Sequence, residues 1–306
     1  MTIGVDLGAT QIRAAICQGD RLEHKRQTLL ENKDVLEKTL DQISDFLSPL
    51  INSNTDGIGI GVPAVVDIPT GTVYNSNNIS SWKRVELKRE LEMRFGLPVH
   101  VNNDANCFAY GAYKYGLEAP CENMVGITLG TGIGIGLVLN GRPYFGSNCG
   151  AGELGILRYL DAHYEDFSSS GFFVTQHQTT AQAANEAAAG GDGEVTAVWR
   201  EYGEHLGQFV KMVLAAYDPE VIAFGGSISK AFPLFEGDLK SALSDFPFQE
   251  TVRRLKLVTM DQQDLAILGA AALWDEYERL DRSALDWKRR SEITHPWPLS
   301  RGEQAC

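Results

Sequence analysis

Hydrophobic positions along the chain alternate between strand-like and helix-like spacing. Short apolar runs predict buried strands at residues 3–7, 12–17, 56–62, 98–101, 124–129 and 221–224. Apolar residues three and four positions apart predict helices at residues 36–50, 87–95, 105–115, 199–217 and 265–279. This alternation of strand and helix is typical of an α/β protein.

Two of the predicted strand pairs are joined by a glycine-rich turn. The first turn is Gly8-Ala9-Thr10, directly after a strand that contains Asp6, and the second is Gly130-Thr131-Gly132. Glycine lets backbone N–H groups approach an anion, and a threonine hydroxyl adds a further donor. Either turn alone could be a hairpin without a ligand, since short glycine patterns are weak signals. Their repetition predicts two similar halves that face one shared anion.

A third glycine segment lies later in the chain. Residues 218–220 read Asp-Pro-Glu and end a predicted helix, because proline cannot continue one. A buried strand follows, and Gly225-Gly226 then opens the next helix. A glycine pair at a helix N-terminus lets the backbone lie flat against a planar or phosphorylated ligand.

Composition and charge narrow the class of protein. The 306 residues are 43% hydrophobic and 22% charged, which is typical of a globular protein with two domains of ordinary size. The longest apolar runs fall short of the roughly 18 residues that a membrane span needs. Because Met1 leads directly into a predicted core strand, we expect no signal peptide and a cytoplasmic location. The net charge of −13 argues against a nucleic-acid partner.

Asp104 is the candidate for the chemistry of the site. It follows a predicted strand and lies in the first turn of a predicted helix, where the helix dipole favours an ionised carboxylate. The alternative interpretation is a helix cap, because Asn103 and Asp104 are both good N-cap residues.

Six ordered motifs resemble those of the ROK (repressor, open reading frame, kinase) family of sugar kinases, within the actin/hexokinase-like ATPase superfamily. They are Asp6-Leu-Gly-Ala-Thr10, Asn103-Asp-Ala-Asn106, Leu129-Gly-Thr-Gly-Ile-Gly134, Gly150-Ala-Gly-Glu-Leu-Gly155, Asp218-Pro-Glu-Val-Ile222 with Gly225-Gly226, and Leu265-Ala-Ile-Leu-Gly-Ala-Ala271. Because Met1 leads directly into the first predicted strand, we expect the chain to lack the helix-turn-helix that ROK repressors carry. The resemblance therefore favours the kinase branch.

The resemblance implies two actin-like (ribonuclease H-like) α/β domains with an interdomain cleft. Residues 1–107 with about 266–281 would form the smaller domain, and residues 108–265 the larger one. Residues 282–306 show no periodicity and contain two prolines, so we expect a disordered tail there. The expected partners are a sugar, ATP and a second copy of the chain in a homodimer.

The resemblance also implies roles for individual residues. Asp104 would accept the proton of a sugar 6-hydroxyl while that oxygen attacks the γ-phosphate of ATP. The implied sugar ligands are Asn78 (or Asn77), Asn103, Asp104, Glu153 and Glu165 (or Asp166). The implied ATP- and phosphate-binding residues are Asp6, Gly8, Thr10, Gly130, Thr131, Gly132, Gly225 and Gly226. Asp6 would also hold Mg²⁺ through water.

The departures from the family pattern concern charge and metal. Gln11 stands where the family has a lysine, and Ile156 where it has a histidine. Residues 157–167 lack the family's cysteines, and the five cysteines of the chain have no metal-ligand spacing, so we expect no zinc. The expected substrate is an aldohexose such as glucose or allose. An N-acetylhexosamine, fructose or β-glucoside kinase and a catalytically silent sugar-binding regulator are the alternatives.

Overall fold

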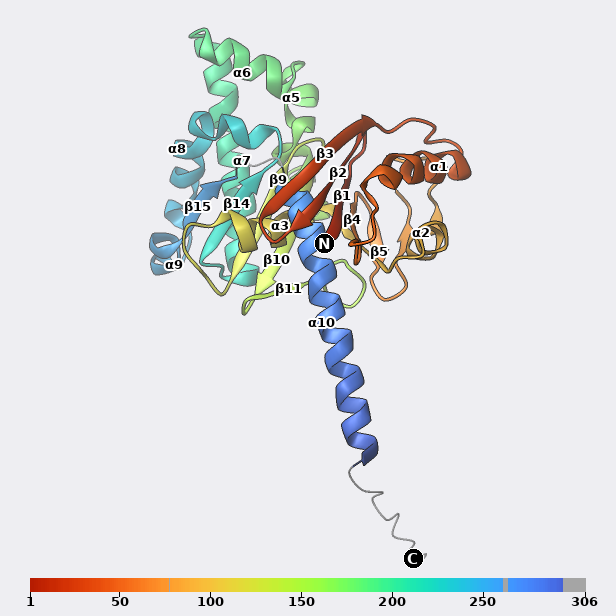
Figure 1. Cartoon of the computed structure of the whole chain (residues 1–306). Coiled ribbons are helices and arrows are strands. Elements are labelled where there is room, and N and C mark those ends of the chain that lie inside the picture. The colour runs from red at the N-terminus through yellow and green to blue at the C-terminus, as the bar shows by residue number, and fades with distance from the viewer. Residues whose placement is uncertain (77, 261–263, 294–306) are drawn as a thin grey trace, which may run out of the picture.

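The computed structural model describes residues 1–76, 78–260 and 264–293. Its frame is a pair of five-stranded sheets, whose arrangement can be followed in Figure 1. The first sheet has the order β3-β2-β1-β4-β8. Neighbours are antiparallel from β3 to β1 and parallel from β1 to β8. Its strands are β1 (Thr2–Leu7), β2 (Gln11–Gln18), β3 (Arg21–Leu29), β4 (Gly57–Val62) and β8 (Val99–Asn103).

The second sheet repeats this arrangement with the order β11-β10-β9-β14-β15. Again two antiparallel neighbours are followed by two parallel ones. The prediction of two similar halves is therefore confirmed, and the two glycine turns join equivalent strand pairs. The strands are β9 (Met124–Leu129), β10 (Ile133–Leu139), β11 (Arg142–Tyr144), β14 (Val221–Gly225) and β15 (Lys256–Thr259).

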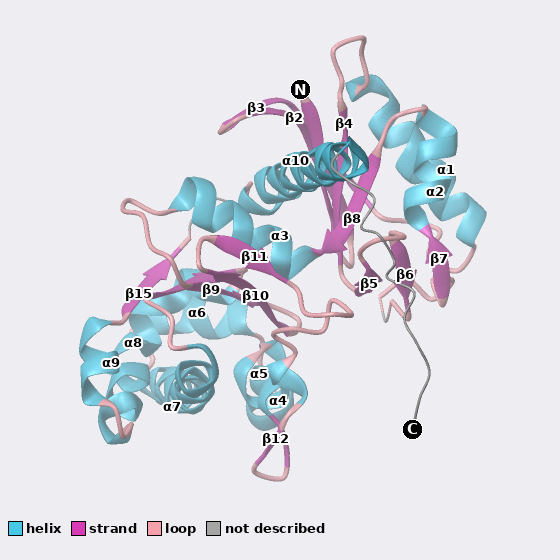
Figure 2. Ribbon diagram, turned by 90° about the horizontal axis from the view of Figure 1, so that it is seen from below, coloured by secondary structure: helices cyan, strands magenta, loops and turns pink. Residues whose placement is uncertain are grey.

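Helices pack on the faces of both sheets. Helices α3 and α10 lie between the two sheets, whereas α7 and α8 pack on the outer face of the second sheet (Figure 2). The helices are α1 (Leu36–Leu47), α2 (Leu87–Phe95), α3 (Asp104–Gly111), α4 (Tyr164–Ser168), α5 (Ser170–His177), α6 (Ala181–Ala189), α7 (Gly193–Tyr217), α8 (Phe232–Ala242), α9 (Gln249–Arg254) and α10 (Leu265–Ile293). The short helical turns are η1 (Ser48–Leu50), η2 (Ala112–Gly116), η3 (Leu154–Ile156), η4 (Ile228–Ala231) and η5 (Leu243–Asp245). The short strands are β5 (Val65–Asp67), β6 (Thr72–Tyr74), β7 (Arg84–Glu86), β12 (Arg158–Tyr159) and β13 (Ala162–His163).

Helix α10 packs on its neighbours through backbone contacts. A Cβ atom added to Gly269 would lie 1.7 Å from the carbonyl oxygen of Cys107 in α3. The reciprocal contact is similar, since a Cβ on Gly111 would lie 1.9 Å from the carbonyl oxygen of Leu265. Glycine is needed at both positions because any side chain would force the two helices apart.

The last helix is longer than predicted. Helix α10 was expected to end near residue 279, but it continues to Ile293 and runs away from the body of the protein (Figure 1). The expected disordered tail from residue 282 is therefore wrong for residues 282–293, and residues 294–306 lie outside the described residues. The segment contains no glycine or proline between Gly269 and Pro296, so helix propensity continues where the apolar pattern ends.

Polar elements were also missed by the apolar pattern. Strand β3 pairs with β2 along its length, although most of its side chains are exposed and charged or polar. An edge strand that needs no second buried face leaves little hydrophobic signal in the sequence. Among the described residues, no helix is both long and apolar enough to span a bilayer.

Candidate active site

A cavity of about 780 Å³ lies between the two halves and collects most of the predicted site residues. Its walls come from the ends of strands in both sheets. Nine predicted residues line it, namely Asn78, Asn103, Asp104, Gly130, Thr131, Gly132, Glu153, Glu165 and Gly226. Four others, Asp6, Gly8, Thr10 and Gly225, are outside its lining, although Ala9 of the first turn contributes to it.

Asp104 faces this cavity because its neighbour caps the helix. The side-chain oxygen of Asn103 accepts the N–H groups of Ala105 at 2.9 Å and Asn106 at 3.3 Å. The cap predicted for one of two residues thus belongs to Asn103, and the Asp104 carboxylate accepts the Ala105 N–H at 2.8 Å.

The surroundings of Asp104 suit a general base at neutral pH. Burial, and then the negative charges of Asp6 and Glu153, raise the pKa of Asp104 to about 7. Asp6 exerts this effect although its own carboxylate is paired with Arg13, whose Nε lies 3.0 Å from Asp6 Oδ2. A carboxylate with a pKa near the working pH can accept a proton and release it again.

The two asparagines of the cavity are held differently. The Asn103 amide has protein partners at both ends, because its nitrogen also donates to the Ala64 carbonyl at 3.3 Å. Asn78 is exposed to the cavity on a loop that the buried Trp82 anchors, with Ser76 N–H donating to the Trp82 carbonyl at 3.0 Å. The alternative candidate, Asn77, lies outside the described residues.

The first glycine turn carries a cation that the sequence analysis missed. Its backbone is closed by a hydrogen bond of 2.9 Å from Gly8 N–H to the Gln11 carbonyl. The ammonium of Lys33 donates to the carbonyl of Ala9 in this turn. Lys33 belongs to no motif, so its position follows only from how the segment before α1 packs.

The second glycine turn carries a carboxylate. Glu165 of α4 accepts the N–H of Ile133 at 3.1 Å through Oε2. A Cβ on Gly132 would lie 2.5 Å from that same oxygen, so the absence of a side chain at 132 makes room for Glu165. Glu165, expected beside the sugar, therefore also touches the turn expected to bind phosphate.

Glu153 lies in the same cavity as Glu165. Burial, and secondly the charge of Glu165, raise the pKa of Glu153 above its ordinary value. The exposed side chain of Ile156 lines the wall beside it, at the position where the family has a histidine. The Ile156 side chain therefore offers no hydrogen bond to a ligand in this cavity.

Aromatic packing holds the segment that follows Ile156. Tyr159 stacks on Tyr164 with ring centroids 4.4 Å apart, and its hydroxyl lies 3.0 Å from His205 Nδ1 of α7. Phe167 packs against both Tyr159 and His205. Within the ranges that the structure describes, no three His, Cys, Asp or Glu side chains are grouped to hold a metal ion. The absence of zinc remains a prediction.

The glycine pair after β14 is required by close packing. Gly226 has φ of +87°, and a Cβ there would lie 2.3 Å from the carbonyl oxygen of Leu129. A Cβ on Gly225 would lie 2.3 Å from the ring of Phe108. These contacts hold β14 against β9 and α3, so the pair has a structural reason in addition to its predicted nucleotide role.

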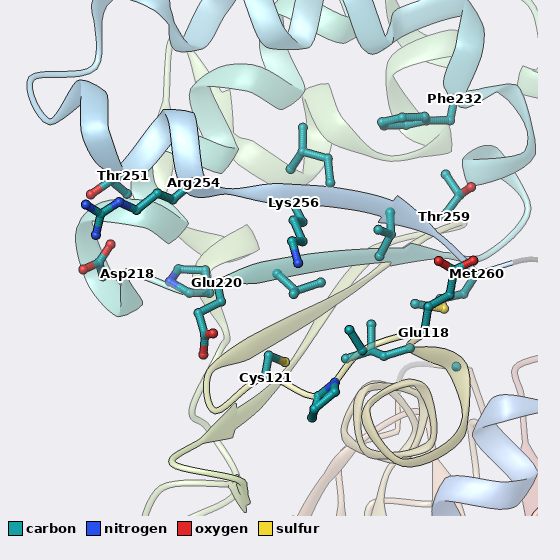
Figure 3. Close-up of a pocket in the computed structure, with 18 of the residues that line it drawn as sticks. Glu118, Cys121, Asp218, Glu220, Phe232, Thr251, Arg254, Lys256, Thr259 and Met260 are labelled. Carbon is teal, nitrogen blue, oxygen red and sulfur yellow. The ribbon is translucent and has the colours of Figure 1, made fainter.

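A larger cavity, of about 920 Å³, follows the edge strand β15 (Figure 3). It contains only residues outside the predicted site. Its lining mixes acids with the cations Arg254 and Lys256. Neither glycine turn and no candidate base lines this larger cavity. The smaller cavity between the two halves is therefore the better candidate for catalysis.

Comparison with known proteins identifies relatives that match most of the chain. The model of the ROK family matches residues 2–277. Glucokinase of Thermotoga maritima is 30% identical over 310 positions, which cover 90% of this chain and 97% of that relative. The xylose repressor of Bacillus subtilis is 26% identical, over 89% of this chain and 76% of its own. A crystal structure of a ROK family glucokinase from Streptomyces griseus, in complex with glucose and AMPPNP, has a TM-score of 0.77 at 23% identity and covers 89% of this chain and 98% of that one.

Proposed function

The chain belongs to the ROK family and has its two-domain, actin-like fold, and we propose that it is an ATP-dependent hexose kinase. In this reaction the γ-phosphoryl group of Mg-ATP passes to the primary 6-hydroxyl of an aldohexose such as glucose or allose. One observation carries the proposal: Asp104, with its pKa raised to about 7, shares a cavity with Asn78, Glu153 and the second glycine turn.

Asp104 acts as the general base. It accepts the proton of the 6-hydroxyl while that oxygen attacks phosphorus, and the bond to the ADP oxygen breaks. Phosphoryl transfer depends mainly on positioning and on neutralising charge, so one carboxylate with a matched pKa is sufficient.

The glycine turns place the phosphates on either side of this base. We propose that Lys33, on the Ala9 carbonyl, provides the positive charge that Gln11 cannot supply. Asp6 would hold Mg²⁺ through water, because Mg²⁺ keeps several waters and takes few protein ligands beside substrate phosphates. Its carboxylate would then serve both the ion and Arg13. The bound ion would neutralise phosphate charge. Gly225 and Gly226 would face the adenosine.

Asn78, Asn103 and Glu153 would bind the sugar hydroxyls, with Glu165 as a further acceptor. Ile156 leaves the adjoining wall without the hydrogen bond of a histidine, so N-acetylhexosamine, fructose and β-glucoside remain second candidates. We also propose that residues 1–107 with 266–281 close against residues 108–265, which excludes water from the phosphoryl group. The enzyme would work in the cytoplasm as a homodimer.

A sugar-binding regulator without activity is the rival function. The resemblance to xylose repressors favours it, as do the replacements at Gln11 and Ile156. The retained base at Asp104 opposes it, because a protein that only binds sugar needs no proton acceptor.

A coupled ADP assay separates the two functions. The panel is glucose, allose, mannose, fructose, N-acetylhexosamines and a β-glucoside, with 6-deoxyglucose as the control that lacks the acceptor. We expect turnover on at least one aldohexose and none on 6-deoxyglucose. No turnover of any sugar in the panel, or turnover of 6-deoxyglucose, would contradict the kinase assignment.

A further inference from the structure

The carboxylate of Glu165 occupies part of the turn that the nucleotide phosphates need. Helix α4, which carries it, starts behind a capping box between His163 and Asp166 and is fixed by the buried Phe167. The next residues bind the same turn, because Ser170 N–H donates to the Gly130 carbonyl at 2.8 Å. Glu165 is thus directed at Ile133 N–H by the packing of α4.

A phosphate at this turn would meet a like charge. Anions are held in such turns by backbone N–H groups, and the Ile133 N–H already has a carboxylate as its partner. The same oxygen sits at Gly132, the last residue of the turn. Like charges this close lower affinity by roughly tenfold or more.

The sugar side of the cavity offers Glu165 a second position. Glu153 and Glu165 are close enough for the charge of one to act on the other, and both line the cavity. Hydroxyl groups of a bound sugar would donate hydrogen bonds to both carboxylates and relieve their repulsion. A bound sugar would therefore draw Glu165 away from the second turn.

We propose that Glu165 gates the nucleotide site: on the Ile133 N–H it disfavours phosphate, and its transfer to the sugar opens the turn. This proposal rests on the proposed kinase function. It assigns Glu165 to the coupling between substrates, with sugar loading before nucleotide. The gate discourages ATP from binding while water is the only acceptor in the cavity.

The test measures nucleotide affinity with and without sugar. Calorimetric titration with the Mg²⁺ complex of a non-hydrolysable ATP analogue is run on wild type, Glu165→Gln and Asp161→Asn. The panel sugar that gives turnover is the second ligand. Asp161 is the matched control, an exposed acid in the turn between β12 and β13 of the same segment, outside the cavity.

For wild type and Asp161→Asn we expect affinity for the analogue to rise roughly tenfold when sugar is present. Glu165→Gln should bind the analogue tightly without sugar and gain little from it. Unchanged sugar-free affinity with only a raised KM for sugar would reduce Glu165 to a sugar ligand and overturn the gate. Weaker nucleotide binding would make Glu165 a magnesium ligand and overturn it as well.

Failure of the gate is distinguishable from failure of the kinase function. If the panel assay shows turnover but Glu165→Gln behaves as wild type in the titration, only the gate is wrong. If no sugar is turned over and the analogue does not bind to any variant, the kinase function is wrong. Thermal melting of Glu165→Gln, compared with wild type, checks that α4 remains folded.

Discussion

The two glycine turns join equivalent strands in sheets of the same order, yet opposite charges rest on them. Lys33 donates to the Ala9 carbonyl in the first turn, whereas Glu165 accepts the N–H of Ile133 beside the second. Neither side chain belongs to the repeated strand–turn–strand unit. If the two turns bind phosphates as proposed, the repeat sets where phosphates can lie, and side chains from other segments set how strongly each turn attracts them.

Because the two turns contact side chains of opposite charge, we expect them to contribute differently to binding in the cavity. The first turn has an ammonium group on its backbone, and the second has a carboxylate that our proposal expects a bound sugar to displace. Asp104 lies in the cavity between them and belongs to neither turn. Substitutions can therefore act on the base or on one turn separately, and each should change a different measurement.

The largest effect is expected at the base. Asp104→Asn should lower kcat by roughly 100-fold or more, because an amide cannot accept the proton, while calorimetry should show sugar and nucleotide still binding. The control is Glu118→Gln in the larger cavity along β15, which should keep wild-type kcat. A near-normal kcat of Asp104→Asn would show that this residue is not the general base. The two turns would then be the remaining candidates for the catalytic machinery.

Removing the cation makes the two turns more alike. Lys33→Met should raise the KM for Mg-ATP roughly tenfold, since one charge-assisted contact is lost, and should leave the KM for sugar near wild type. Lys25→Met is the matched control, because Lys25 pairs with Asp264 at 2.6 Å instead of with a turn. An equal rise in both KM values would contradict the assignment of Lys33 to phosphate.

The pH profile tests the charges around the base. The pKa of Asp104 is raised to about 7, so the ionised, active base is present above that pH and is lost as the pH falls through it. We expect kcat/KM to decline on the acid side with a midpoint in this range. Asp6→Asn should move the midpoint to lower pH, because a neighbouring negative charge is removed. A midpoint in the ordinary carboxylate range for wild type would contradict this environment.

The smallest effect should come from a chelator. The segment that brings Glu165 to the second turn is held by Tyr159, Tyr164 and His205. We therefore expect no change in the thermal midpoint with EDTA in the absence of nucleotide, and no stoichiometric zinc by elemental analysis. About one zinc per chain would mean that aromatic packing is not the main support of this segment. His163 would then be the first candidate zinc ligand to reconsider.

Sequence reasoning reached the repeated strands, both turns and Asp104, because each depends on local spacing that glycine and capping residues mark directly. Lys33 could not be found in this way, since its contact with Ala9 depends on a loop path between distant segments. Glu165 was expected beside the sugar, but its contact with Ile133 could not be foreseen, since that contact follows from the docking of a five-residue helix. The length of α10 was missed because its last turns lack an apolar pattern.

The crossing of α3 and α10 bears on how such chains can diverge. Gly111 and Gly269 each sit against the backbone of the opposite helix, and a single methyl group would come within 1.9 Å and 1.7 Å of a carbonyl oxygen. Neither glycine can be substituted alone during evolution, because moving one helix away would also disturb the contacts that the other helix makes with its sheet. In an alignment of relatives we expect these two sites to change rarely and together, while surface positions on the same helices vary freely. A lineage with larger residues at both sites would be expected to show a wider angle between its two halves.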